Sequence, residues 1–120
     1  MRKLSESIED YIEHIYCLNS EKGVRITDLA VRMNVTKASA TDAVKKLVDF
    51  KYVKHQKYGN VFITKLGEGI AKKILEKHNI ITKYLIEVLG VDPVTAETDA
   101  CKIEHIISET TFSKLKEKVE

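Results

Sequence analysis

The sequence of 120 residues contains only two cysteines, Cys17 and Cys101, and their spacing fits no disulfide framework. No apolar run approaches the roughly 20 residues that a membrane-spanning helix requires, and the amino-terminal segment lacks the apolar core of a secretion signal. Internal repeats, low-complexity tracts and flexible linkers are missing as well. These absences argue against a disulfide scaffold, a membrane protein and a repeat array. We therefore expect a cytoplasmic location and reduced thiols.

The charges of the chain are distributed unevenly. Residues 1 to 75 carry 14 Lys and Arg against 9 Asp and Glu, whereas residues 76 to 120 carry 6 basic and 9 acidic residues. Within residues 25 to 65 the counts are 9 basic and 3 acidic. This segment is suited to binding a polyanion, although a basic face exposed to water would give the same pattern. The acidic remainder is suited to binding cations.

Apolar periodicity predicts three helices in the first half of the chain, over residues 5–19, 26–33 and about 37–50. A break at Asn34-Val35-Thr36 separates the second helix from the third, which is typical of a helix-turn-helix. The third helix is expected to bury Ala40, Val44, Leu47 and Val48. Segments 51–56 and 61–64 then flank Lys57-Tyr58-Gly59-Asn60, which predicts a β-hairpin.

A long helix is predicted to begin after its cap, Thr64, and to end at Gly90, and its roughly 24 residues would span roughly 36 Å. Its apolar stripe contains Leu66, Ile70, Ile74, His78, Ile81 and Leu85. Because that stripe exceeds what one partner can cover, we expect a homodimer interface. Asp92-Pro93 begins the next helix, and Ser108 is the expected cap of the last one.

The helices and the hairpin together predict a winged helix-turn-helix that binds double-stranded DNA. The third helix would present its amino-terminal residues to the major groove, while lysines would contact phosphates. An ordinary amphipathic helix with hydrated lysines is the alternative for any single residue. The candidate DNA-binding residues are Thr36, Lys37, Ala38, Ser39, Thr41, Asp42, Lys45, Lys46, Lys54 and Lys57.

Side chains able to bind metal share one face of a predicted helix at Cys101, Glu104 and His105, because their spacing is i, i+3 and i+4. A thiol, a carboxylate and an imidazole form most of a transition-metal site. Asp10 and Glu13 share a helix face by the same argument. His78 lies on the inward stripe of the long helix, where a satisfied core histidine is as reasonable as a ligand.

Four segments carry a resemblance to a known family: IEDYIEHIY (8–16), ITDLAVRMNVTKASATDAVKKLVDF (26–50), GNVFITKLG (59–67) and CKIEH (101–105). In this order they resemble the diphtheria toxin repressor family, specifically its manganese transport regulator branch. The resemblance covers essentially the whole chain and implies a metal-activated, dimeric DNA-binding repressor. The larger branch adds a carboxy-terminal domain like an SH3 barrel, which we do not expect in a chain ending at Glu120.

The resemblance implies metal ligands at Asp10, Glu13, His78, Cys101, Glu104 and His105. The manganese branch commonly has a carboxylate at the position of Cys101, whereas the iron branch has the cysteine but a methionine at the position of Asp10. We therefore favour Mn²⁺, with Fe²⁺ next and Co²⁺ or Zn²⁺ as substitutes in vitro. Whether a second ion binds nearby, and whether Glu97 or Cys17 contributes to metal binding, stays open. Thr82 lacks the carboxylate of the iron branch's ancillary site.

The expected fold is mainly α. Residues 1–64 form the winged helix-turn-helix DNA-binding domain and residues 65–120 the helical metal-binding and dimerisation domain. The expected function is metal-activated repression of metal-homeostasis genes, with metal fixing the spacing of the DNA-binding domains on a palindromic operator. A metal-independent winged-helix regulator is the alternative. An enzyme is not expected, because metal donors alone do not specify catalysis, and no organic cofactor is expected.

Overall fold

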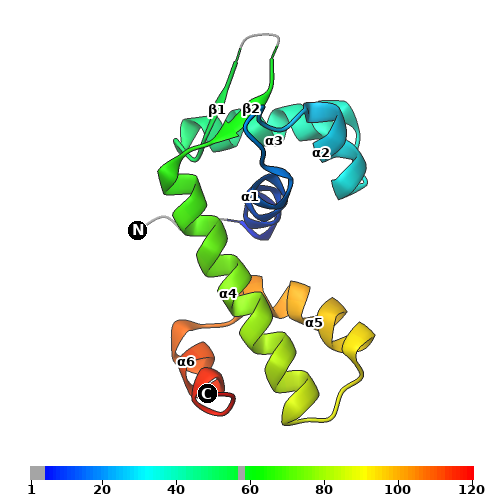
Figure 1. Ribbon diagram of the computed structural model, residues 1–120, viewed down its shortest axis with the longest axis vertical. Coiled ribbons are helices and arrows are strands. Elements are labelled where there is room, and N and C mark those ends of the chain that lie inside the picture. Colours follow the sequence, from blue (N-terminus) through cyan, green and yellow to red (C-terminus); the bar gives the residue numbers. More distant parts are fainter. Residues whose placement is uncertain (1–4, 57–58) are drawn as a thin grey trace. The chain divides into compact units, whose positions relative to one another are not determined.

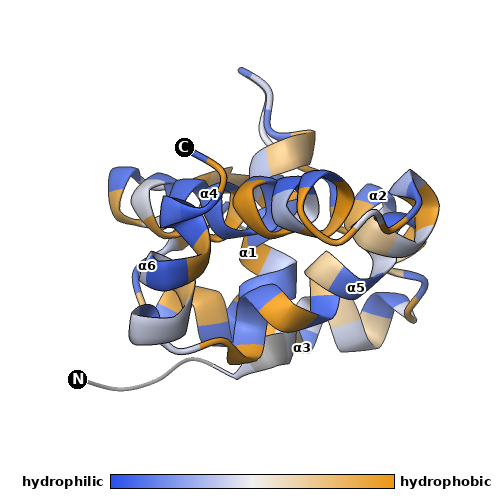
Figure 2. Cartoon of the chain, turned by 90° about the horizontal axis from the view of Figure 1, so that it is seen from below, coloured by the Kyte–Doolittle hydropathy of each residue, from blue (hydrophilic) through white to orange (hydrophobic). Residues whose placement is uncertain are grey.

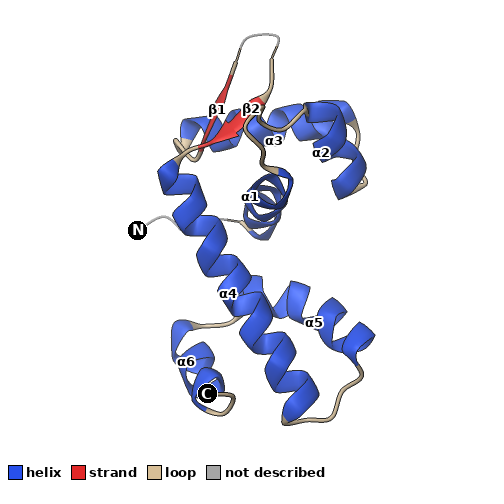
Figure 3. Cartoon of the chain, viewed as in Figure 1, coloured by secondary structure: helices blue, strands red, loops and turns tan. Residues whose placement is uncertain are grey.

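The computed structural model describes residues 5–56 and 59–120, which form helices and one small antiparallel sheet (Figures 1 and 3). The elements are α1 (Glu6–Leu18), α2 (Ile26–Met33), α3 (Lys37–Asp49), β1 (Val53–His55), β2 (Val61–Ile63), α4 (Lys65–Glu87), α5 (Pro93–Ile106) and α6 (Glu109–Glu117). Their order confirms the mainly helical fold, a winged helix-turn-helix followed by a helical domain.

The chain forms two compact units, one extending to Lys72 and the other running from Lys73 to Glu120. The division between these units falls inside α4, whose residues run from Lys65 to Glu87. The domain boundary that the sequence suggested, between residues 64 and 65, coincides with the start of α4 and stays a prediction.

The turn of the helix-turn-helix depends on Asn34, which adopts a left-handed conformation with φ of 55° and ends α2. Asn tolerates this region better than most residues with a side chain. Thr36 then caps α3, because its hydroxyl accepts a hydrogen bond from the Ser39 N–H at 3.1 Å. Asn34 therefore ends α2 and Thr36 begins α3, which makes the connection between the two helices short.

The core of the first unit is formed where α1 packs against α2 and α3 and where α3 packs against β1. Its fully buried aliphatic side chains are Ile12, Ile15, Leu29, Val44, Leu47, Val53 and Val61. The expectation that Val48 is buried was wrong, since it is 39% exposed while Ala43 is buried. Residue 43 precedes Leu47 by one turn, so the inward face of α3 is rotated slightly from the predicted one.

The wing is a two-stranded hairpin in which Val53 pairs with Ile63, Lys54 with Phe62 and His55 with Val61. The strands are shorter than the segments predicted from β-forming residues. A bridge between Val24 and Val61 joins the hairpin to the segment that precedes α2 (Figure 1). Lys57 and Tyr58, in the predicted turn, lie outside the described residues.

The start of α4 is fixed to the hairpin by Thr64. Its hydroxyl donates to the backbone oxygens of Lys51 and Tyr52 at 2.8 and 3.0 Å and accepts from the Gly67 N–H at 3.1 Å. Hydrophobic and hydrophilic residues alternate around α4 (Figure 2), with Ile74, His78 and Ile81 buried. Leu66 was expected on the buried stripe but is 55% exposed, because Gly67 is the residue that faces Tyr52 at this turn.

In the second unit, α5 and α6 each begin at a capping residue. Asp92 accepts from the Thr95 N–H at 2.9 Å and Ser108 from the Thr111 N–H at 3.1 Å, which confirms both predicted helix starts. The hydrogen bond from Thr95 holds the pKa of Asp92 below its usual value. Ile81 of α4, Ala100 of α5 and Phe112 of α6 form the apolar core.

Ion pairs on the outside of the second unit connect α4 to α6. Lys77 Nζ lies 2.9 Å from a carboxylate oxygen of Glu109, and Lys116 Nζ lies 2.8 Å from Glu76. The hydrogen bond from Lys77 lowers the pKa of Glu109. Each pair includes a carboxylate that is more than half exposed, so these pairs add little stability. Within the described ranges, no helix has the length and apolar character needed to cross a membrane.

Replacing Gly67 by Ala should lower the free energy of unfolding by about 1–3 kcal/mol, the usual cost of forcing atoms into a packed site. A Cβ there would overlap the carbonyl oxygen of Tyr52 and lie 2.9 Å from Ile63 Cγ1. Gly69→Ala is the matched control on the same helix, since a Cβ added there would meet no described atom within 4 Å beyond its own turn of helix. It should raise stability by up to about 1 kcal/mol through helix propensity. Urea denaturation measures both, and equal changes would contradict the packing argument.

Candidate metal centre and DNA-binding surface

A cluster of metal-binding side chains lies inside the second unit, where α4 contributes His78 and α5 contributes the others. The α5 members are Glu97, Cys101, Glu104 and His105, which are spaced so that they share one face of the helix. His78 occupies the buried stripe of α4 one turn from Ile74 and Ile81. The sequence-based placement of His78 on the inward face is therefore confirmed.

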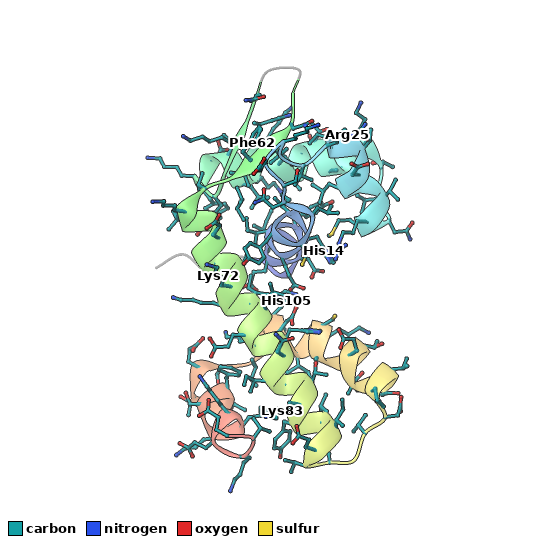
Figure 4. All side chains as sticks on the ribbon, in the orientation of Figure 1. His14, Arg25, Phe62, Lys72, Lys83 and His105 are labelled. Carbon is teal, nitrogen blue, oxygen red and sulfur yellow. The ribbon has the colours of Figure 1, made fainter. Side chains whose placement is uncertain are left out.

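The imidazole of His78 lies between two carboxylates. Its Nδ1 is 2.8 Å from Glu104 Oε2, and its Nε2 is 2.8 Å from Glu97 Oε1. The Cys101 sulfur lies 3.8 Å from the same Nδ1. His105 Nε2 is 3.3 Å from Glu104 Oε1, so the Glu104 carboxylate is flanked by two imidazoles (His105 is labelled in Figure 4).

Three members of this cluster, His78, Glu104 and His105, are buried, whereas Glu97 and Cys101 are exposed, and the buried carboxylate is what suits the cluster to a cation. The side chains of Glu104 and His105 have no exposed surface, and that of His78 is 9% exposed. A carboxylate removed from water is costly unless positive charge and hydrogen bonds compensate it. Imidazole nitrogen, carboxylate oxygen and thiol sulfur are together the donor types of first-row transition metals. The side chains present therefore fit a divalent metal ion.

The two predicted donors of the first unit lie on α1. Carboxylate oxygens of Asp10 and Glu13 come within 4.8 Å of each other, as their spacing on one helix face requires. Asp10 is half-buried, whereas Glu13 is only 7% exposed. Among the described residues, the buried Oε1 of Glu13 has no hydrogen-bond partner. A buried acceptor of this kind carries a desolvation cost that a cation would relieve.

Glu97 is a residue of this cluster that the sequence-based interpretation did not include among the metal ligands, since its contribution was left open. The signal was nevertheless present, since Glu97, Cys101 and Glu104 repeat at i, i+4 and i+7. Cys17, whose contribution to metal binding the sequence left open, is exposed. His14 is half-buried, and its Nδ1 accepts a hydrogen bond from Arg32 Nε at 2.8 Å.

The predicted DNA-binding residues lie on the outer face of α3 and on the wing. Thr41 is half-buried, and Lys57 lies outside the described residues. The exposed ones are Thr36, Lys37, Ala38, Ser39, Asp42, Lys45, Lys46 and Lys54. Two hydroxyls of the predicted set donate hydrogen bonds within the protein: Thr36 donates to Ser39 Oγ at 3.0 Å, and Thr41 donates to the Lys37 carbonyl at 2.8 Å. Their DNA contacts stay a prediction.

Two family models match the chain over nearly its whole length. Residues 3–61 match the iron dependent repressor N-terminal DNA binding domain, and residues 64–120 match the iron dependent repressor metal binding and dimerisation domain. The two matches divide the chain into a DNA-binding half and a metal-binding half.

Individual proteins are also similar to the chain. An uncharacterised HTH-type transcriptional regulator of Methanocaldococcus jannaschii is 40% identical over 115 residues, covering 94% of this chain and 92% of the relative. The HTH-type transcriptional regulator MntR of Bacillus subtilis is 34% identical over 110 residues, covering 91% of this chain and 77% of the relative. A solved manganese-dependent transcriptional repressor in complex with manganese shares the fold, with a TM-score of 0.84 and 24% identity. The match covers 93% of this chain and 52% of that one, so this chain spans about half its length.

The role of Thr36 as a helix cap predicts how its variants behave. Thr36→Ala should lower the free energy of unfolding by about 1 kcal/mol, because the Ser39 N–H loses its acceptor. Thr36→Ser should keep nearly full stability, since the hydroxyl remains. Lys37→Ala is the neighbouring control, which should change stability by less than about 0.5 kcal/mol at an exposed position. Urea denaturation measures all three, and a fully stable Thr36→Ala protein would argue against the cap.

Proposed function

Because this chain belongs to the iron-dependent repressor family, whose members are metal-dependent transcriptional repressors, we propose that it is a metal-activated repressor of metal-homeostasis genes. The observation that carries this proposal is the buried Glu104 carboxylate, which lies between the imidazoles of His78 and His105 with Cys101 beside it. The family binds operator DNA and dimerises. We propose that this chain also forms a homodimer and binds a palindromic operator. In that complex, α3 would lie in the major groove.

The proposed metal ligands are Asp10, Glu13, His78, Cys101, Glu104 and His105. Their carboxylates and imidazoles suit Mn²⁺, whereas the Cys101 thiol favours softer ions such as Fe²⁺, Co²⁺ or Zn²⁺. The name of the Bacillus subtilis relative, MntR, is consistent with Mn²⁺, so we place Mn²⁺ first and Fe²⁺ second. These six ligands are enough to bind one ion, and their number also allows a second ion.

The donors differ in which half of the chain carries them. Asp10 and Glu13 belong to the DNA-binding half, and the remaining ligands belong to the metal-binding half. A bound divalent ion supplies the positive charge that neutralises these carboxylates. We propose that a metal ion bound by donors from both halves fixes the spacing of the DNA-binding domains that two operator half-sites require. Brought together without that ion, the carboxylates of Asp10, Glu13 and Glu104 would repel one another.

This proposal predicts a metal-dependent change in DNA affinity. The affinity of the full chain for labelled palindromic DNA from a metal-transport promoter should rise at least about 10-fold on adding Mn²⁺, a typical coupling between two binding sites. Glu104→Gln should lose most of that rise, since the amide is neutral. Glu117→Gln is the control, because Glu117 is an exposed carboxylate on α6. Equal DNA affinity with and without metal would instead favour a metal-independent winged-helix regulator.

The metal preference is predicted to depend on Cys101. Replacing Cys101 with Glu should shift the preference toward Mn²⁺ relative to Fe²⁺ and Zn²⁺, because a hard oxygen replaces a soft sulfur donor. Cys17→Ser is the matched control, since the Cys17 thiol is also exposed but lies on α1. Anaerobic titrations with each metal, read out by DNA binding, measure the order of affinities. If the order is the same in both variants and the unmodified protein, the thiol does not determine selectivity.

A further inference from the structure

The two ring nitrogens of His78 face different carboxylates in different surroundings. Nδ1 points to the buried Glu104 and to the Cys101 sulfur, which are two of the other proposed ligands. Nε2 points to Glu97, whose side chain is 63% exposed. One nitrogen therefore belongs to the interior of the cluster and the other to its outer edge.

For His78 to bind a metal beside Glu104, its Nδ1 must offer a lone pair. Glu104 by itself works against this requirement, because a carboxylate 2.8 Å from Nδ1 is an acceptor and favours a proton on that nitrogen. With the proton on Nδ1, the lone pair of a neutral imidazole lies on Nε2 and faces away from Cys101. A hydrogen-bond acceptor at Nε2 is needed to favour a proton on that nitrogen instead of on Nδ1.

We propose that Glu97 is a positioning residue that keeps a proton on Nε2 of His78, so that Nδ1 is the atom available to bind metal. This inference rests on the proposed function, because it concerns how one proposed ligand presents its donor atom. Carboxylates that accept from the far nitrogen of a metal-binding histidine fix its tautomer and ring orientation, and their loss typically weakens metal binding 10–100-fold. The 2.8 Å contact between Nε2 and Glu97 Oε1 has the geometry that this role requires.

The position of Glu97 supports a positioning role over simple surface pairing. Glu97 lies one turn before Cys101 on the face of α5 that contacts α4, so the helix itself aims its carboxylate at His78. Asp99, two residues later, is exposed. Since residues two apart on a helix do not share a face, Asp99 provides an acidic control from the same helix.

The first test reads the ring nitrogens of His78 directly, in ¹⁵N-labelled metal-free protein at a fixed neutral pH. In the unmodified protein, Nε2 should carry a proton that persists when Zn²⁺, a diamagnetic probe, is added and Nδ1 becomes the ligand. In Glu97→Ala, the metal-free ring should shift toward the form protonated on Nδ1. Asp99→Ala should leave the ring spectrum unchanged. A purely structural contribution of Glu97 would not move the proton between the two nitrogens.

The second test measures Zn²⁺ affinity by competition with a chelating dye. Glu97→Ala should bind Zn²⁺ about 10–100-fold more weakly, because the wrong nitrogen is presented. Glu97→Gln should recover much of the affinity, since its amide oxygen still accepts from Nε2. Asp99→Ala should bind as the unmodified protein does. Thermal unfolding of each metal-free variant separates these effects from a loss of folding.

The outcomes separate this inference from the function on which it rests. Unchanged ring nitrogens and Zn²⁺ affinity in Glu97→Ala, with Zn²⁺ bound through Nδ1 of His78 in the unmodified protein, would overturn only the role of Glu97. Zn²⁺ bound through Nε2 would do the same. If the unmodified protein binds neither Zn²⁺ nor Mn²⁺, the proposed metal site fails as well.

Discussion

Glu104 carries a carboxylate with no exposed surface, and the arrangement of the second unit around it follows from the cost of burying that charge. His78 and His105 lie against its two oxygens, and Cys101 lies near His78. Such a group is stable only where partners supply hydrogen bonds or positive charge. The same requirement that shapes the packing of α4 against α5 therefore also creates a site suited to a cation.

The long helix α4 carries residues with two different sets of contacts. Near its start, Thr64 and Gly67 hold the helix against the wing, and further along, His78 and Ile81 face α5 and the apolar core. A single helix thus carries residues that contact the DNA-binding fold and residues that contact the donor cluster.

Local signals in the sequence predicted most of the fold. The caps at Asp92 and Ser108 and the break at Asn34-Val35-Thr36 act within a few residues, so they could be recognised without the tertiary structure. The error at Leu66 arose where the packing neighbour, Tyr52, is distant in sequence, and the error at Val48 arose from a small rotation of the inward face of α3. Periodicity finds an apolar face but does not define its edges, and Val48 and Leu66 are exposed.

The candidate site divides in the same way. The sequence by itself determined the donor types and the faces shared by Asp10 with Glu13 and by Cys101 with Glu104, because helical spacing fixes those relations. Only the tertiary structure decided that His78 lies between Glu104 and Glu97, since that contact joins residues 19 and 26 positions apart on two helices. It also decided which nitrogen faces which carboxylate. Spacing along a chain cannot orient an imidazole ring, whereas packing between α4 and α5 does.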